Sequence, residues 1–199
     1  MPNLAVFASG NGSNFEAIAL ALQRTSHKVV CLISDNENAY ALIRAERLRI
    51  PHHVFPFRTA AERKASEENI IRLLRSYETD FIALAGFMRL LSPTLIDAFP
   101  NRIVNIHPSL LPKYPGTHGI LESYRSGDEE LGITIHYVDY GMDTGPIILQ
   151  KSFKRKGTET LEEIEERIHA LEHEVYPIVL IDLLEKMNVE RKGDTLCES

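Results

Sequence analysis

The sequence predicts an α/β fold: a Rossmann-like, three-layer domain with a mostly parallel central sheet and an antiparallel element in its C-terminal half. Short apolar runs alternate with amphipathic segments of helical period through the first half of the 199-residue chain, as in successive βαβ units. In the second half two apolar runs follow one another around a turn rich in Gly, Asp and Pro. That succession favours a hairpin or an antiparallel edge of the sheet.

Seven segments have the length and apolar content of strands: Leu4–Ser9, Val29–Asp35, His52–Phe57, Phe81–Gly86, Ile103–His107, Gly132–Val138 and Ile147–Phe153. Six segments have helical patterns, and the longest repeats apolar residues at intervals of three and four: Asn14–Arg24, Ala39–Arg49, Ala60–Tyr77, Pro93–Ala98, Ile120–Ser126 and Thr160–Lys186. Pro177 lies inside the last segment and predicts a kink or an interruption there, because proline lacks an amide hydrogen and clashes with the preceding turn.

Composition is that of a soluble globular protein, with 44% hydrophobic and 25% charged residues. We expect one domain over residues 1–199, ending in a frayed polar tail at 188–199. The net charge of −6 argues against nucleic-acid binding, and no apolar run approaches the roughly 18 residues of a membrane span. The start of the chain lacks a signal peptide, and Cys31 and Cys197 lie in unlike surroundings. We therefore expect a cytoplasmic protein without a disulfide or a cysteine metal site.

The first chemical motif is the glycine-rich loop that follows the first predicted strand. Glycines allow a tight turn and a close approach to a ligand, and Ser13 with Glu16 has the spacing of a capping box, which predicts the start of a helix. Such a helix start can hold a phosphate. Phe15 stands where a dinucleotide fingerprint needs its third glycine, so a mononucleotide or a sugar phosphate fits better than NAD. The loop residues are Gly10, Asn11, Gly12, Ser13 and Asn14.

Asn105 and His107 are the strongest candidates for catalysis. They are two residues apart at the end of an apolar run, so in a strand they lie on the same face. A hydrogen-bond donor beside a titratable imidazole can stabilise an oxyanion and move a proton. A Pro-rich loop follows at once, and strand ends of this kind carry the chemistry of α/β proteins.

A third element is the loop at 139–146, which contains two acids, two glycines and a proline. If the strands on either side of it adjoin the Asn105 strand, Asp143 could lie near His107 and favour the imidazolium. The alternative is that Asp143 only caps a turn. His136 sits among apolar residues of a predicted strand and has the context of a structural histidine, whereas His118 follows a turn and could line the site.

Several segments, taken together, resemble the glycinamide ribonucleotide formyltransferases over nearly the whole chain. The matching segments are Ser9–Asn14, Leu84–Arg89, Asn105–Gly116, Asp143–Pro146 and Glu172–His173. The resemblance implies transfer of a formyl group from 10-formyltetrahydrofolate to the amine of glycinamide ribonucleotide, a step of de novo purine synthesis. It implies no metal, because the formyl group is already activated.

The resemblance also implies roles for individual residues. Asn105 and protonated His107 would stabilise the oxyanion, and Asp143 would keep His107 protonated and order a proton-relaying water. The glycine-rich loop would bind the substrate phosphate and Glu172 the ribose. Residues of about 1–100 would form the phosphate-binding half and about 101–187 the folate and catalytic half. The folate site would include Arg63, Met88, Arg89, Leu90, Leu91, Asn105, Asp139, Tyr140, Gly141, Met142 and Asp143.

Three other functions remain open at this level. A hydrolase of 10-formyltetrahydrofolate would share the Asn, His and Asp, but normally carries a regulatory domain before the first strand. A methionyl-tRNA formyltransferase would add an RNA-binding domain, which the acidic charge disfavours. A non-catalytic module that binds a phosphoribosyl ligand would use His107 as a passive contact. The expected partners are the two small substrates, and apolar strands near 100–150 could support a homodimer.

Overall fold

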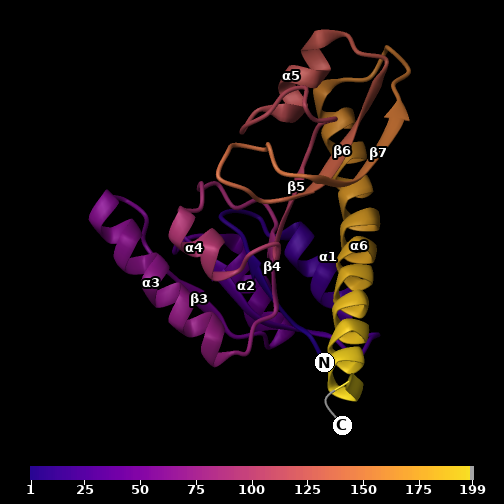
Figure 1. The fold of residues 1–199 in the computed structure, drawn as a ribbon. Helices are drawn as coiled ribbons and strands as arrows, with labels where there is room; N and C mark the ends of the chain where they lie inside the picture. Colours follow the sequence, from indigo (N-terminus) through magenta and orange to yellow (C-terminus); the bar gives the residue numbers. More distant parts are fainter. Residues whose placement is uncertain (198–199) are drawn as a thin grey trace.

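The computed structural model describes the backbone of residues 1–197 and the side chains of residues 1–189 (Figure 1). Seven strands form one sheet in the order β3-β2-β1-β4-β5-β6-β7. The strands are β1 (Asn3–Phe7), β2 (Lys28–Ser34), β3 (His52–Val54), β4 (Phe81–Leu84), β5 (Ile103–His107), β6 (Glu130–Tyr137) and β7 (Ile147–Lys154). The helices are α1 (Ser13–Leu22), α2 (Tyr40–Leu48), α3 (Ala60–Ser76), α4 (Pro93–Ala98), α5 (Gly119–Ser126) and α6 (Leu161–Cys197).

The pairing of the strands confirms the predicted fold class. Strands β1 to β5 pair in parallel, whereas β6 is antiparallel to both β5 and β7. Every predicted strand and helix is present, with bounds that differ at several ends. The predicted strand His52–Phe57 is shorter, ending at Val54, since Pro56 cannot donate a ladder hydrogen bond.

Two apolar layers lie on opposite faces of the sheet. Alternate residues of β1 separate them, because successive side chains of a strand point to opposite faces: Leu4 and Val6 pack with α1, α2 and α6, while Ala5 and Phe7 pack with α3 and α4. Figure 1 shows α3 and α4 on the side of the sheet away from α1 and α6. The structure therefore has the three layers that the sequence predicts.

The final helix, α6, differs from the prediction in two respects. Pro177 lies inside the helix and does not interrupt it, although its ring removes one backbone hydrogen bond. The helix also continues to Cys197, beyond the predicted end at Lys186. No described helix is both long enough and apolar enough to span a membrane.

Tyr176 anchors α6 to the sheet beside β5, the strand that carries Asn105 and His107. Its side chain is fully buried, and its hydroxyl lies 3.0 Å from the carbonyl oxygens of both Leu84 and Val104. These carbonyls belong to β4 and β5, so the contact fixes the helix against the two strands whose ends carry candidate site residues.

We expect Tyr176→Phe to lower the free energy of unfolding by roughly 1–2 kcal/mol, because the hydroxyl hydrogen bonds are buried and water cannot replace them. Urea denaturation followed by circular dichroism measures this change. Tyr40→Phe is the matched control, since the Tyr40 hydroxyl accepts a hydrogen bond from Arg47 at the exposed surface, and it should shift stability by less than about 0.5 kcal/mol. Equal effects of the two substitutions would contradict the assigned role of Tyr176.

Candidate active site

The candidate site lies where the strand order reverses direction. After β3 the chain returns to the opposite side of β1 and continues through β4 and β5, and α/β proteins bind ligands in the crevice at such a switch point. A cleft of about 710 Å³ opens there. It is lined by the loops after β1, β4 and β5, the loop between β6 and β7, and one face of α6.

The glycine-rich loop lines one end of this cleft and runs directly into α1. Gly10 has open space where a Cβ would stand, so a ligand can approach its backbone. Gly12 has a φ of 74°, and a Cβ there would lie 2.5 Å from the Cβ of Ala41. Only glycine therefore lets α2 pack against the loop while the amides at the start of α1 stay free to face an anion.

The capping box predicted at Ser13 and Glu16 is wrong. The helix does begin at Ser13, but Gly12 is its N-cap and no side chain caps it. Glu16 forms an ion pair with Arg44 instead, and Arg44 also donates to the backbone and side-chain oxygens of Asn11. Long-range pairing with α2 thus replaces the local cap, leaving the helix start without a side-chain acceptor.

Asn14 and Glu172 meet beside the glycine-rich loop, although 158 residues separate them in sequence. The amide nitrogen of Asn14 donates to the Glu172 carboxylate at 2.9 Å, and the amide oxygen of Asn14 is buried with no hydrogen-bond partner among the described residues. Burial raises the pKa of Glu172, against the opposing effects of Asn14 and His169. A polar ligand such as a sugar hydroxyl could satisfy this pair.

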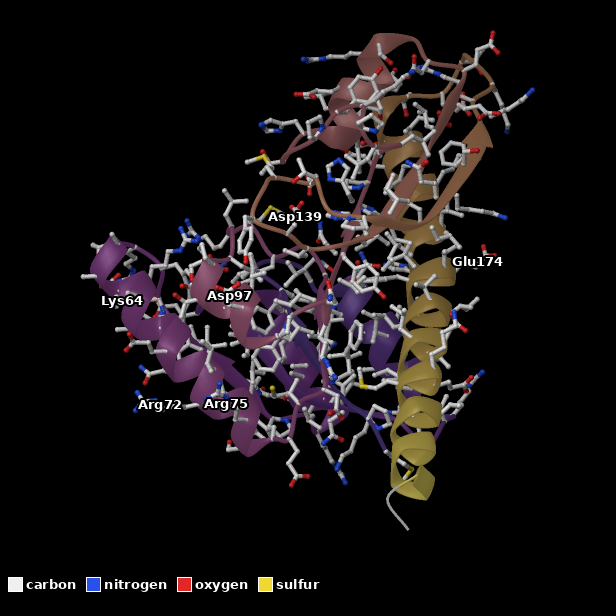
Figure 2. All side chains as sticks on the ribbon, in the orientation of Figure 1. Lys64, Arg72, Arg75, Asp97, Asp139 and Glu174 are labelled. Atoms are coloured by element: carbon white, nitrogen blue, oxygen red, sulfur yellow. The ribbon has the colours of Figure 1, made fainter. Side chains whose placement is uncertain are left out.

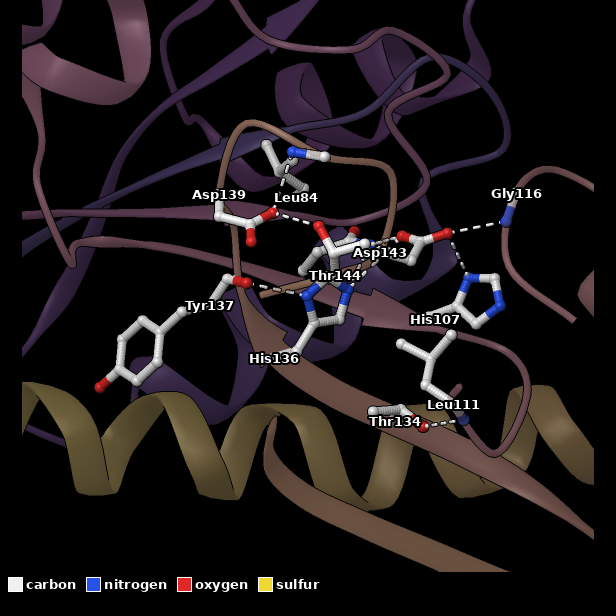
Figure 3. Close-up of polar contacts among 12 residues, drawn as sticks. Leu84, His107, Leu111, Gly116, Thr134, His136, Tyr137, Asp139, Asp143 and Thr144 are labelled. Carbon is white, nitrogen blue, oxygen red and sulfur yellow. Dashed lines mark hydrogen bonds and ion pairs between the residues drawn. The ribbon is translucent and has the colours of Figure 1, made fainter. Parts of the chain in front are cut away.

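Asn105 and His107 project from β5 into the same cleft, as the strand period predicts. Asp143 reaches them from the loop between β6 and β7 (Figure 3). One carboxylate oxygen lies 3.4 Å from the Asn105 amide nitrogen, and the other lies 3.4 Å from Nδ1 of His107. The backbone amide of Gly116 donates to the second oxygen at 2.8 Å. The structure thus brings the three candidate catalytic residues together.

The His107 ring faces protein acceptors at both of its nitrogens. Nε2 lies 2.7 Å from the carbonyl oxygen of Tyr114, which can only accept, so this nitrogen carries a proton. In the neutral ring, Nδ1 then presents a lone pair to the Asp143 carboxylate. Gly119 is required beside the ring, because a Cβ there would lie 3.0 Å from Nε2.

Burial and the neighbouring acceptors act on the pKa of His107 in opposite directions. Burial lowers the pKa of His107 below its ordinary value, and this effect exceeds the opposing influence of the Asp143 carboxylate and the Tyr114 carbonyl. The role of Asp143 in keeping His107 protonated stays a prediction. The carboxylate pulls in the expected direction, but desolvation of the ring is larger.

Asp143 itself remains a carboxylate. Burial raises the pKa of Asp143, but this is outweighed by hydrogen bonds to the His136 ring and the Gly116 amide and by electrostatic interaction with His107 and His136, so that the net pKa is lowered. A partly buried, ionised carboxylate among hydrogen-bond donors can hold a water or a protonated ring in a fixed direction.

The predicted folate residues form two loops that face one another across the cleft. Met88 and Leu90 are exposed on the first loop, as are Tyr140 and Met142 on the second. The Tyr140 hydroxyl donates to Asp97 of α4 at 2.5 Å, which ties the second loop to α4; Figure 2 labels Asp97 on that helix and Asp139 on the loop. Arg89, Leu91, Asp139 and Gly141 complete the predicted set that lines the cleft.

Arg63 is the exception among the predicted residues, because it is not part of the cleft lining. Its guanidinium donates to the carbonyl of Leu90 and to the buried carboxylate of Glu67. Glu67 also accepts from the backbone amide of Ser92 at 3.0 Å. In this structure Arg63 therefore supports the loop after β4 from behind.

Three histidines belong to the cleft in addition to His107: His118, His136 and His169. His136 lies opposite Asn105 in the antiparallel ladder, 3.2 Å from its amide nitrogen and 3.5 Å from the Asp143 carboxylate. The prediction that His136 is structural did not include these contacts, because they depend on the register of β5 and β6. His169 precedes Glu172 by three residues on α6, and this helical spacing could have indicated that it shares the site.

No cluster of three or more His, Cys, Asp or Glu side chains suited to a metal ion occurs in the described part of the chain.

Comparison with known proteins shows that most of the chain is similar to one group of enzymes. The model of the family described as formyl transferase matches residues 2–180. A phosphoribosylglycinamide formyltransferase of Bacillus subtilis is 48% identical over 186 residues, which are 92% of this chain and 95% of that protein.

Solved structures agree with the sequence relatives. Phosphoribosylglycinamide formyltransferase from Bacillus halodurans superposes with a TM-score of 0.88 at 42% identity, covering 93% of this chain and 96% of its own. Glycinamide ribonucleotide transformylase 1 from Geobacillus kaustophilus superposes with a TM-score of 0.86 at 47% identity, covering 92% and 99%. These values show that the fold is shared over more than nine tenths of the chain, with 42% and 47% of the sequence identical.

We expect Asp143→Asn to lower the pKa of His107 further, because the carboxylate charge that opposes burial is removed while the ring stays buried. At any pH near the transition the ring of the variant should then be less protonated than the wild-type ring. NMR titration of the histidine ring signals measures the two pKa values. An unchanged or raised His107 pKa in the variant would contradict the electrostatic link between the two groups.

Proposed function

The chain belongs to the formyl transferase family, and we infer that it is a folate-dependent formyltransferase of de novo purine biosynthesis. It transfers the formyl group of 10-formyltetrahydrofolate to the amine of 5'-phosphoribosylglycinamide, giving 5'-phosphoribosyl-N-formylglycinamide and tetrahydrofolate. One observation supports this reaction above the others: Asn105, His107 and Asp143 meet in the same cleft as a helix start suited to a phosphate. Both substrates are small molecules.

The phosphate of the substrate binds at Gly10, Asn11, Gly12, Ser13 and Asn14. The open backbone at Gly10 and the uncapped start of α1 support this assignment. Glu172 binds the ribose, supported by its buried contact with Asn14 beside the loop. This binding places the glycinamide amine toward β5.

The folate enters from the other end of the cleft, between the loops at 86–91 and 139–143. The exposed apolar side chains of Met88 and Met142 offer contact area to a flat aromatic ring system. Arg63 contributes through the loop that it supports. The domain over residues 1–199 thus has its phosphate site in residues of about 1–100 and most of its catalytic groups in about 101–187.

The reaction begins when the neutral amine attacks the formyl carbon. A C–N bond forms, the carbonyl electron pair moves to oxygen, and Asn105 and His107 donate hydrogen bonds to this oxyanion. A water held by Asp143 carries a proton from the new ammonium to N10 of the folate. The bond between carbon and N10 then breaks, and the electron pair on oxygen restores the carbonyl.

The pKa of His107 responds to this reaction. Burial lowers it and the Asp143 carboxylate raises it, and the negative charge that develops on the oxyanion raises it further. Nδ1 of the ring already faces Asp143, and Nε2 faces the Tyr114 carbonyl. His107 therefore gives up one of these two contacts when it donates a hydrogen bond to the oxyanion. The donor is thereby strongest when charge develops, which favours the transition state over the ground state.

We also infer a homodimer in the cytoplasm. The edge strand β7 supports the dimer, since this strand of eight residues ends the sheet and no described strand pairs with its outer side. The free, buried thiol of Cys31 suits a reducing compartment. Analytical ultracentrifugation should find twice the mass of one chain, and a species of single-chain mass at micromolar concentration would contradict the dimer.

We expect His107→Ala and Asn105→Ala each to lower kcat for formyl transfer by about a hundredfold or more, because each removes a donor to the oxyanion. Initial rates with both substrates, followed by the absorbance change on formation of tetrahydrofolate, measure this loss. His52→Asn is the control, since His52 lies on β3 away from the cleft, and it should retain near wild-type turnover.

The same assay separates the proposed reaction from its alternatives. Turnover should depend strictly on phosphoribosylglycinamide, and each tetrahydrofolate formed should be matched by one formylated product. Release of formate without the amine substrate would indicate a hydrolase, and the absence of any turnover would indicate a binding module. Near-normal turnover in His107→Ala would exclude the assigned mechanism.

A further inference from the structure

An ion pair at the end of β2 involves the loop at 86–91 (the folate loop), which is one of the two loops proposed to bind the folate. Asp35 follows β2, and its Oδ2 accepts a hydrogen bond of 2.6 Å from Nε of Arg89. The Asp35 side chain is 4% exposed and the Arg89 side chain is 48% exposed. The pair therefore joins a buried carboxylate to a guanidinium that reaches the cleft.

The buried carboxylate has a single partner. Oδ1 of Asp35 is buried without a hydrogen-bond partner among the described residues, so the favourable contacts of this charge come mainly from Arg89. A buried charge that relies on one partner strongly favours the conformation that keeps the contact. This favours one orientation of the Arg89 side chain, even though much of it faces solvent.

The residue before Arg89 is also held at the ends of β1 and β2. The backbone amide of Met88 donates to the Ser9 hydroxyl at 2.8 Å, and the Ser9 carbonyl accepts from the side chain of Asn36. Successive residues of the folate loop are thus held at the ends of β1 and β2, one through its backbone and the next through its side chain. Arg63 holds Leu90 on the other flank.

The geometry leaves part of the guanidinium free. Asp35 uses Nε, and neither terminal nitrogen of Arg89 makes a hydrogen bond with another described residue. Arg89 is also the one Lys or Arg among the described residues that line the cleft. Since the glutamate portion of a folate carries carboxylates, and the two terminal nitrogens of an arginine match a carboxylate, Arg89 is the available partner for that negative charge.

We propose that Asp35 is a positioning residue for the folate co-substrate: it holds Arg89 through Nε and so directs the two terminal nitrogens at a carboxylate of the folate glutamate. The proposal rests on the folate-dependent activity inferred above and adds a residue outside the cleft lining. Asp35 touches neither substrate and acts only through Arg89.

The first test compares Asp35→Asn with Glu37→Gln. Both remove one negative charge within three residues, but Glu37 pairs with Arg58 at the exposed surface, 3.8 Å apart. Asp35→Asn should raise KM for 10-formyltetrahydrofolate about tenfold while kcat and KM for phosphoribosylglycinamide stay within about twofold. Glu37→Gln should change none of the three. A fall in kcat, or an equal rise of both KM values, would indicate general structural damage and overturn the proposal.

The second test removes the carboxylates from the co-substrate. With 10-formyltetrahydropteroate, which lacks the glutamate, Asp35→Asn and the wild type should have the same KM. The double variant Asp35→Asn/Arg89→Met should have the same KM for 10-formyltetrahydrofolate as Arg89→Met alone, since the two residues act as one unit. A defect that persists with the truncated co-substrate, or effects of the two substitutions that multiply, would overturn the proposal.

Two controls keep the outcomes distinct. If Asp35→Asn lacks a cooperative thermal transition, Asp35→Glu replaces it, because it keeps the charge and moves it by one methylene group; the same selective rise in folate KM is expected. Absence of formyl transfer by the wild type would overturn the proposed function itself. Normal wild-type turnover with unchanged folate KM in the Asp35 variant would overturn only the role of Asp35.

Discussion

The partly buried carboxylate of Asp143 is the group on which the arrangement of the site depends. It joins the loop between β6 and β7 to β5 through Asn105 and His107, and to the loop after β5 through the amide of Gly116. A buried charge is stable only when donors surround it, so these segments must close around it together. The same carboxylate brings the candidate catalytic side chains together and opposes the effect of burial on the pKa of His107.

The sheet topology places the two halves of the cleft side by side. Parallel strands end at one edge of the sheet, and the reversal of strand order at β1 leaves the loops after β1 and β4 adjacent and free of covering helices. Ser9 uses this adjacency, since its backbone leads into the glycine-rich loop while its hydroxyl accepts the amide of Met88. The proposed phosphate-binding and folate-binding loops are therefore joined directly through Ser9.

Much of the fold could be predicted because local pattern and tertiary structure agree. The strand and helix periods predicted every element, and the spacing of Asn105 and His107 correctly predicted that the two residues share one face of β5. Predictions failed where distant contacts outweighed local signals. Glu16 pairs with Arg44 of another helix and does not cap α1, and α6 continues through Pro177. The buried face of α6, with Tyr176 bonded to the sheet, stabilises the helix on both sides of the proline.

The sequence by itself determined the α/β class, the position of the glycine-rich loop and the strand that carries Asn105 and His107, because these depend on periodicity and on residues close in the chain. Its motifs also indicated the family. Only the tertiary structure decided the contacts between segments: His136 beside Asn105, Arg63 behind the folate loop, and Asp35 on Arg89. It also decided that burial lowers the pKa of His107. Strand register, packing and desolvation exist only once the chain has folded, and they set which groups meet and which of them carry charge.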